Sequence, residues 1–249
     1  MREAERGSLP TSRGLWDVIL GNGHPKGGDH ERACEAPLQA MVRQDRGDTP
    51  YSFRRFLVVD CTGGPGCPTA HDGSHVVACV CVFDSQTQGF ANMAAALAEA
   101  VEALKESDWT GGAARLDQGW HAAAPVSLVM PVEEEGSDGH ASSCESTGAT
   151  TPSKAPARVA SLEAVFTAPD HRRQGLMKML LRAAIAQCKR EHFSCANILV
   201  HMKNTAAQRV YMGAGFVKVS QRTHPEFEKL FGDPGFAFLR LQLLDPCSP

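Results

Sequence analysis

The sequence lacks a long apolar run, since none approaches the roughly 20 residues that a membrane-spanning helix needs. The segment from Met1 to Gly14 mixes Arg with Glu and has no apolar stretch of the kind that a secretory signal carries. A basic surplus is absent too: 25 Lys and Arg stand against 28 Asp and Glu, a net charge of −3. General nucleic-acid binders need positive charge to neutralise phosphates. We therefore expect no membrane partner and no nucleic-acid partner.

Regular cysteine spacing is also lacking. The nine cysteines are odd in number and scattered along the chain, which argues against a framework of disulfides. Several lie in apolar, strand-like runs, where a reduced thiol behaves as a small hydrophobic side chain: Cys79, Cys81, Cys188 and Cys195. This usage predicts a reducing compartment, the cytoplasm or alternatively the nucleus.

A single domain accounts for the 249 residues, because a chain of this length can bury one sizeable core. Within it, residues 131–156 predict a disordered loop, since Glu133 to Pro156 is rich in Ser, Thr, Gly and Glu and lacks periodicity. Residues 86–130 predict a helical insertion, because Phe90 to Trp109 places apolar residues at steps of three and four. Residues 157–244 form the core of the domain.

The remaining patterns predict alternating strands and helices. Before the insertion we expect a helix at Glu31 to Arg46 and strands at Phe53 to Cys61 and His75 to Phe83. A short strand is expected at Val126 to Val132. In the core we expect, in order, a strand at Arg158 to Thr167, a helix at Arg173 to Arg190, a strand at Ala196 to Met202, a helix at Thr205 to Ala214, and strands at Phe216 to Ser220 and Phe236 to Leu244. This order is typical of an α/β or α+β fold with a mixed sheet.

A strand-to-helix junction in the core has the chemistry of a phosphate site. Pro169 cannot donate an N–H, so it ends the strand. The first N–H groups of the helix that follows lack partners within it and point outward with the positive end of the helix dipole. Gly175 permits close approach of a ligand to the backbone, and Arg172 and Arg173 supply forked donors suited to phosphate oxygens. Alone, this R-x-x-G pattern is also explained by a helix start with solvated arginines.

A second motif follows one strand later. From Asn204 to Phe216 the sequence has the form N-x-x-A-x-x-x-Y-x-x-x-G-F. With both motifs in this order and separation, the segment from Arg158 to Leu244 resembles the GNAT superfamily of N-acetyltransferases. The resemblance implies a mixed, mostly antiparallel central sheet flanked by helices, acetyl-CoA as co-substrate, and transfer of an acetyl group to an amine by direct attack. A non-catalytic acyl-CoA-binding or regulatory module is the alternative.

The resemblance also implies which residues bind acetyl-CoA. Its pantetheine arm would pair with the strand before the helix, its pyrophosphate would lie on the helix start, and the second motif would contact the pantetheine. The residues concerned are Val165, Phe166, Thr167, Arg172, Arg173, Gln174, Gly175, Leu176, Met177, Asn204 and Tyr211. Met177 departs from the family pattern, which usually has Gly or Ala there, so its side chain either crowds the phosphate or points into the core.

Two residues are candidates for proton transfer. Tyr211 matches the position that protonates the departing thiolate in many family members, and a phenol with a pKa of about 10 stays protonated at neutral pH. Glu163, nine residues before Arg172, resembles a strand glutamate that serves as general base in some members. Deprotonating a lysine-like amine of pKa about 10.4 at pH 7 costs about 4.6 kcal/mol. Alternatively water takes the proton, and Glu163 faces solvent or binds the amine. His201, at the end of the next strand, is a structural histidine, a base or a substrate contact.

A zinc site is one interpretation of Cys61, Cys67, His71 and His75, since two thiols and two imidazoles can hold zinc tetrahedrally. Their spacing lacks the dozen or so residues that separate the two pairs of a zinc finger, and a Gly- and Pro-rich hairpin explains them without a metal. We predict no metal site, with a zinc-containing interaction protein as the alternative. The sequence leaves the acceptor open between a small-molecule amine and a protein amine, and it does not indicate an oligomeric state.

Overall fold

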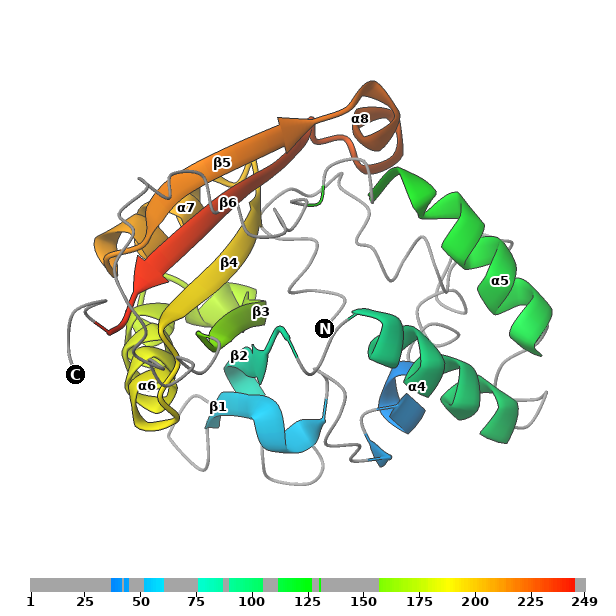
Figure 1. The fold of residues 1–249 in the computed structure, drawn as a ribbon, viewed down its shortest axis with the longest axis horizontal. Coiled ribbons are helices and arrows are strands. Elements are labelled where there is room, and N and C mark those ends of the chain that lie inside the picture. Colours follow the sequence, from blue (N-terminus) through cyan, green and yellow to red (C-terminus); the bar gives the residue numbers. More distant parts are fainter. Residues whose placement is uncertain are drawn as a thin grey trace, which may run out of the picture.

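A six-stranded sheet organises the computed structural model of the chain (Figure 1). The structure describes residues 37–41, 43–44, 52–60, 76–86, 90–104, 112–126, 130 and 157–244. The strands are β1 (Phe56–Asp60), β2 (Val76–Asp84), β3 (Val159–Thr167), β4 (Cys195–His201), β5 (Val217–Thr223) and β6 (Gly235–Gln242). Their order across the sheet is β1-β2-β3-β4-β6-β5, and only β3 and β4 pair in parallel among these described strands. The predicted mixed, mostly antiparallel sheet is confirmed.

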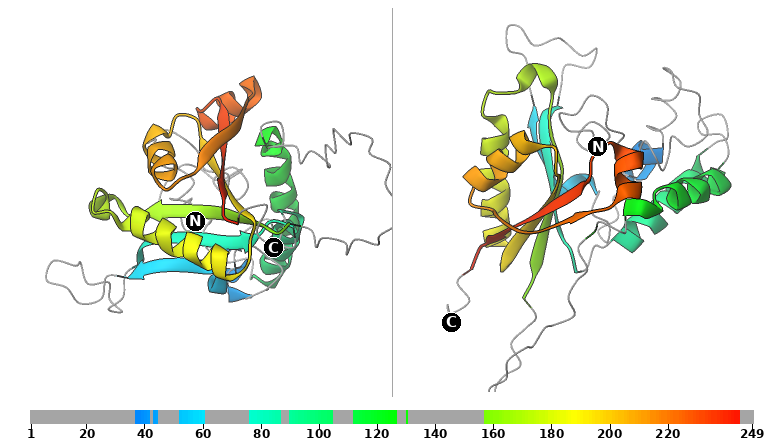
Figure 2. Two further views of the ribbon diagram at one scale, coloured as in Figure 1. Left: turned by 60° about the vertical axis from the view of Figure 1, so that its left-hand side comes forward. Right: turned by 90° about the horizontal axis from the view of Figure 1, so that it is seen from above.

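Helices cover both sides of this sheet. The α-helices are α4 (Phe90–Ala103), α5 (Gly112–Ala122), α6 (Leu176–Arg190), α7 (Thr205–Gly213) and α8 (Pro225–Phe231). The view from above shows α6 and α7 on one side of the sheet and α4, α5 and α8 on the other (Figure 2). Described residues 37–41 and 43 are helical too, within the helix predicted there.

Each side has its own hydrophobic core. On the first, α6 buries a stripe at helical spacing, Leu180, Leu181, Ala184 and Cys188. This stripe packs in one cluster with side chains of β2, β3, β4 and β6, and with Tyr211 of α7. On the second, Leu97 of α4, Leu116 of α5 and Phe227 of α8 belong to a separate cluster. The sheet therefore carries two distinct apolar layers, one on each face.

The strand β5 has a different environment from the others. It lies at one edge of the sheet and, among the described strands, pairs with β6 alone. All seven of its residues are exposed, and they include Val217 and Val219. Its contribution to the sheet comes from the β6 ladder.

Several predicted boundaries need correction. The helix α6 begins at Leu176 and not at Arg173, because Pro169–His171 forms a 3-10 turn and Arg173 has a positive φ that no α-helix contains. Residues Phe53–Arg55 form a 3-10 helix ahead of β1. Ala124–Val126 forms another, so a strand starting at Val126 is wrong.

Two helices were not predicted, namely α5 and α8. Both lie on the second side of the sheet and contribute buried side chains to its core. Whether residues 86–130 are an insertion stays a prediction; the described part of this region contains α4, α5 and the 3-10 helix Ala124–Val126. Residues 131–156 lie outside the described part of the chain.

The hairpin of β5 and β6 provides a stability prediction. A Cβ added at Gly235 would overlap the carbonyl oxygen of Arg222 on the neighbouring strand. Because that oxygen belongs to the backbone, Gly235→Ala must displace the hairpin, and we expect it to lower the free energy of unfolding by about 2 kcal/mol or more. Urea denaturation measures the change.

The matched control is Gly213→Ala, at the end of α7, where an added Cβ meets nothing within 4 Å. It should leave stability unchanged or raise it by about 0.4–1 kcal/mol through the reduced entropy of the unfolded chain. Equal effects of the two substitutions would contradict the packing described at Gly235.

Candidate functional site

The pairing between β3 and β4 stops partway along the two strands. Their parallel pairing covers Val159 to Leu162 on β3 and ends at Ile198 on β4. Among the described strands, β3 continues beyond this point to Thr167 paired only with β2, and β4 continues to His201 paired only with β6. Figure 2 shows β4 and β6 turning away from β3. Two strand edges inside the sheet thus face an opening, where their N–H and C=O groups are available to a ligand with amide groups.

A β-bulge shapes the β3 side of this opening. Cys79 of β2 is opposite Phe166, whereas Cys81, two residues on, is opposite Glu163, three residues back. The bulge therefore contains one more residue on β3 than on β2. Ala164 lies within it, and its φ of 49° is in the left-handed region. Its carbonyl oxygen accepts a hydrogen bond from the Cys79 thiol at 3.3 Å. Bulges of this kind redirect a strand and are frequent next to binding sites.

The bulge sets which backbone groups face the opening. The N–H of Ala168 donates to the Val77 carbonyl at 2.8 Å, so this peptide group points toward β2. Successive peptide groups of a strand point to opposite edges. The N–H groups of Thr167 and Val165 therefore point away from β2, toward the opening. These are two of the residues that the sequence predicts for cofactor binding.

The loop between β3 and α6 is built around two left-handed residues. Arg173 and Gly175 have φ values of 63° and 79°, and consecutive N–H groups in such a turn form a concave anion-binding surface. Gly175 is the N-cap of α6, and no side chain caps the helix start. Arg172 donates from Nε to the Thr167 carbonyl at 3.2 Å, while Gln174 donates to that of Asp170 at 3.3 Å.

The positions around Gly175 are open. Arg172 to Gly175 are exposed, and in the described part of the chain a Cβ built on Gly175 meets no atom within 4 Å beyond its immediate chain neighbours. The next two residues, Leu176 and Met177, are half-buried and pack against the core on the α6 side. Of the two alternatives for Met177, the structure therefore favours packing into the core.

The second predicted motif forms α7. Asn204 is the N-cap of this helix, and its Oδ1 accepts a hydrogen bond from the Ala207 N–H at 3.1 Å. Tyr211 is 5% exposed and its ring centroid lies 6.4 Å from that of Phe216. Burial raises the pKa of the Tyr211 phenol, so it stays protonated throughout the physiological range. Asn204 has at least a structural role, and Tyr211 has the protonation state that an acid needs.

Glu163 lies on the opposite face of β3 from the α6 core. Leu162 before it is buried in that core, and side chains alternate along a strand. The carboxylate of Glu163 is half-buried beside Cys81. Burial, and secondly the charge of Glu163, raise the pKa of the Cys81 thiol well above its ordinary value.

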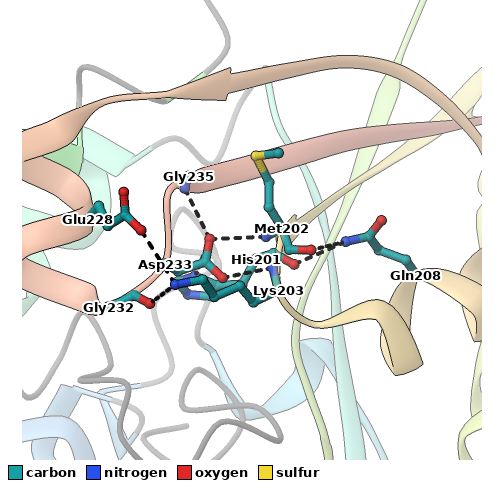
Figure 3. Close-up of polar contacts among 8 residues, drawn as sticks. All are labelled: His201, Met202, Lys203, Gln208, Glu228, Gly232, Asp233 and Gly235. Atoms are coloured by element: carbon teal, nitrogen blue, oxygen red, sulfur yellow. Dashed lines mark hydrogen bonds and ion pairs between the residues drawn. The ribbon is translucent and has the colours of Figure 1, made fainter.

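A polar cluster closes the other arm, where β4 ends (Figure 3). The buried carboxylate of Asp233 accepts backbone hydrogen bonds from Met202 at 3.2 Å, Lys203 at 2.8 Å and Gly235 at 3.0 Å. Nδ1 of His201 lies 3.9 Å from Asp233 Oδ1. That nitrogen is buried and makes no hydrogen bond within the described part of the chain. Asp233 thus joins the end of β4 to the start of β6.

The pKa of Asp233 reflects opposing influences. Burial is the largest and acts to raise the pKa, but the neighbouring His201 and the backbone hydrogen bonds from Gly235 and Lys203 together lower it below its ordinary value. The 3.9 Å separation is too long for a direct hydrogen bond from His201, so we ascribe the lowering chiefly to the two backbone donors. Asp233 is therefore a carboxylate at neutral pH.

The structure brings some predicted residues together and separates others. Residues 165–167 and 172–177 follow one another along the opening and the start of α6, while Glu163 and His201 lie on its two arms. Sequence reasoning missed Asp233. The only signal was a Gly-Asp-Pro-Gly turn before the last strand, which marks a turn and not a contact with His201.

Other predicted features lie outside the described residues, namely Cys61, Cys67, His71 and His75. In the part that the structure does describe, no group of three or more His, Cys, Asp or Glu side chains could hold a metal ion. Four buried cysteines, Cys79, Cys81, Cys188 and Cys195, are free thiols. Among the described helices none has the length and apolar character to cross a membrane.

Comparisons with known proteins bear on these residues. The model of the acetyltransferase (GNAT) family matches residues 93–216. No curated protein matches the chain. Among solved structures, the NatC complex bound to Gag peptide and CoA is 23% identical, with 38% of this chain and 57% of that chain covered and a TM-score of 0.32.

Two further structures illustrate the range. The ribosomal-protein-S18-alanine N-acetyltransferase from Escherichia coli is 20% identical over 36% of this chain and 59% of that one, with a TM-score of 0.29. An N-acetyltransferase from Staphylococcus aureus Mu50 is 14% identical, with 91% of this chain and 89% of that chain covered and a TM-score of 0.46. The chain thus spans 57% of the NatC structure and 59% of the Escherichia coli acetyltransferase, less than two thirds of the length of either.

The lowered pKa of Asp233 predicts acid sensitivity. Since the folded protein binds this proton more weakly than the unfolded chain, the stability that Asp233 contributes is complete above its ordinary pKa of 3.8 and is lost as the pH falls below it. Asp233→Asn should be less stable than the wild type at pH 6 by about 1–3 kcal/mol, because the buried backbone N–H groups that donate to the carboxylate would be poorly satisfied. The difference should shrink toward pH 3, as followed by urea denaturation at each pH. A difference that stays constant would contradict the ionised state of Asp233.

Proposed function

Because the chain belongs to the acetyltransferase (GNAT) family through residues 93–216, we propose that it transfers an acetyl group from acetyl-CoA to a primary amine. The observation that carries the proposal is the opening between β3 and β4 beside the uncapped start of α6. The acceptor is a small-molecule amine or a protein amine. We place the protein in a reducing compartment, the cytoplasm or the nucleus, since its described cysteines are free.

The residues present fit acetyl-CoA. The pantetheine arm contains amide groups, which match the N–H and C=O groups that β3 presents at Val165 to Thr167. The pyrophosphate is an anion, which matches the backbone turn between Arg173 and Gly175 and the positive end of the helix dipole. Gly175 adds open space at this position, and Arg172 and Arg173 add positive charge.

The chain's own groups would supply the chemistry. Acetyl-CoA, when bound, provides a thioester whose carbonyl carbon accepts the amine. The N–H of Val165 faces the opening and would donate to the oxygen on which negative charge develops. Tyr211 would give its proton to the leaving sulfur. Glu163 on the acceptor side would receive the amine proton, directly or through water, or bind the ammonium group.

Binding of acetyl-CoA tests the site before any acceptor is known. In a calorimetric titration of the full chain we expect saturable binding at micromolar concentrations. Arg173→Glu should weaken it at least about tenfold, because a charge-assisted hydrogen bond contributes about 1.5–3 kcal/mol and about 1.4 kcal/mol corresponds to a factor of ten.

Arg182→Glu is the matched control, since it makes the same charge change at an exposed position farther along α6 and should leave binding within about twofold. No binding by the folded wild type would overturn the proposed function. Binding without transfer to any amine would leave an acyl-CoA-binding module.

The role of Tyr211 is tested by Tyr211→Phe. Because only the hydroxyl is removed from a side chain that is otherwise packed in the core, acetyl-CoA affinity should be retained while turnover falls by about 10²–10⁴-fold. As burial raises the pKa of the phenol, the wild type should show no loss of activity from Tyr211 ionisation up to pH 9. Steady-state kinetics from pH 6 to 9 measure both. Full turnover in the variant at every pH would exclude Tyr211 as the acid.

A further inference from the structure

His201 lies beside the opening between β3 and β4. It ends β4, three residues after Ile198, where pairing with β3 stops. Ile198 and Val200 are buried on the α6 side, so by alternation His201 points to the opposite face. Glu163 shares that face on the other arm of the opening. The imidazole thus lies beside the opening, on the face where an acceptor would approach the thioester.

The imidazole is also held in one orientation. Its ring centroid lies 4.7 Å from that of Phe236 and 6.0 Å from that of Phe227. The side chain is 18% exposed, but Nδ1 is buried, so the exposed part of the side chain excludes Nδ1. The ring therefore presents its outer portion, which carries Nε2, toward solvent and keeps Nδ1 inside.

Asp233 determines what Nδ1 faces. Its Oδ1 is 3.9 Å from Nδ1, and its side chain is fully buried. Three backbone N–H groups fix the carboxylate, so it is not free to turn away. A fixed negative charge beside Nδ1 favours the tautomer with the proton on Nδ1, which leaves the lone pair of Nε2 available to accept a proton. The separation is long, as catalytic hydrogen bonds often are before the ligands bind.

We propose that Nε2 of His201 accepts the proton of the acceptor amine, with Asp233 as the positioning residue that holds its tautomer and stabilises the imidazolium. This role rests on the proposed function, and it identifies the group that takes the proton from the acceptor amine. Glu163, on the opposite arm, then attracts the ammonium form of the acceptor to the opening.

The proton and electron pairs balance. The ammonium gives one proton to His201, and the freed nitrogen pair forms the C–N bond to the carbonyl carbon. The C–S bond breaks, its electron pair stays on sulfur, and sulfur takes the Tyr211 proton. The second proton that nitrogen loses returns Tyr211 to the phenol. His201 releases its proton to solvent, so one proton is released for each acetyl group transferred from an ammonium.

The neighbouring charges favour this arrangement. Lys203, next but one along the chain, donates from Nζ to the Gly232 carbonyl at 2.7 Å and to Glu228 at 3.5 Å. The charged side chains on α8 and on the segments beside it are Glu226, Glu228, Lys229, Asp233 and Lys203, together with Glu163 across the opening, and Glu226 pairs with Lys229 at 2.6 Å. Of these, only Asp233 faces Nδ1 within 4 Å.

The tautomer can be measured without an acceptor. Nitrogen-15 NMR of the imidazoles in the full chain, assigned with His201→Gln, should show the neutral His201 ring with its proton on Nδ1. In Asp233→Asn the population of the Nε2–H tautomer should grow. Glu228→Gln is the matched control, since it removes a nearby carboxylate that does not face Nδ1, and it should leave the tautomer unchanged. A wild-type His201 protonated on Nε2 would overturn the inference, and so would a spectrum insensitive to Asp233→Asn.

Kinetics test the proton transfer itself, with acetyl-CoA and spermidine, tyramine and a lysine-containing peptide as probe amines. At pH 7 His201→Gln should lower kcat/KM by about 10²–10⁴-fold. The deficit should narrow toward pH 10, where the amine is already deprotonated, and Glu228→Gln should remain within about twofold. Unchanged kcat/KM in His201→Gln, or a deficit independent of pH, would overturn the inference and leave the proposed function standing. Failure of the wild type to bind acetyl-CoA, or to acetylate any probe, would overturn both.

Discussion

The candidate site depends on a parallel strand pairing that stops after four residue pairs. Past that point, each of the two strands keeps one neighbour and loses the other among the described strands, so within the part of the chain that the structure describes the sheet has two backbone edges in its interior. Such edges are normally confined to the outside of a sheet, where solvent satisfies them. The antiparallel neighbours β2 and β6 hold the two arms in place up to Thr167 and His201. The opening is therefore a built feature of the hydrogen-bonding pattern and not a gap in packing.

The two-residue period of the strands separates the chemistry between the two faces. The face toward α6 and α7 carries the helix start, with its positive dipole end, and Tyr211 within an apolar core. The other face carries Glu163 and His201, with the Asp233 carboxylate behind the latter. Positive groups suited to phosphate and negative or basic groups suited to an amine thus lie on opposite sides of the same strands. Opposite charges in one pocket would pair with each other and be less available to the two substrates.

Much of residues 157–244 could be predicted from the sequence, because most strands and helices there have a recognisable period and clear end signals. The helix α8 was missed although His224 and Pro225 begin it and Gly232 ends it in the left-handed conformation, since seven residues give too short a period to recognise. α5 was missed because its apolar residues are few and it starts with glycine.

The site was predictable in part, for a physical reason. Binding of a phosphate uses consecutive residues at one helix start, so its pattern is local in the sequence. The bulge at Ala164 depends on the register with β2, and the approach of Asp233 to His201 depends on the pairing of β4 with β6. Contacts of that kind arise only after the sheet has formed, and a single sequence does not reveal them.

The exposed edge strand β5 has a consequence for how this chain can vary. Since all seven of its side chains are open to solvent, it contributes to the fold through its backbone ladder with β6, and its side chains are under little packing constraint. Evolution can therefore change their chemistry at low cost to folding. An open edge bearing Val217 and Val219 is also a template for further strands, and Lys218 and Arg222 beside them add positive charge that discourages a second copy from extending the sheet.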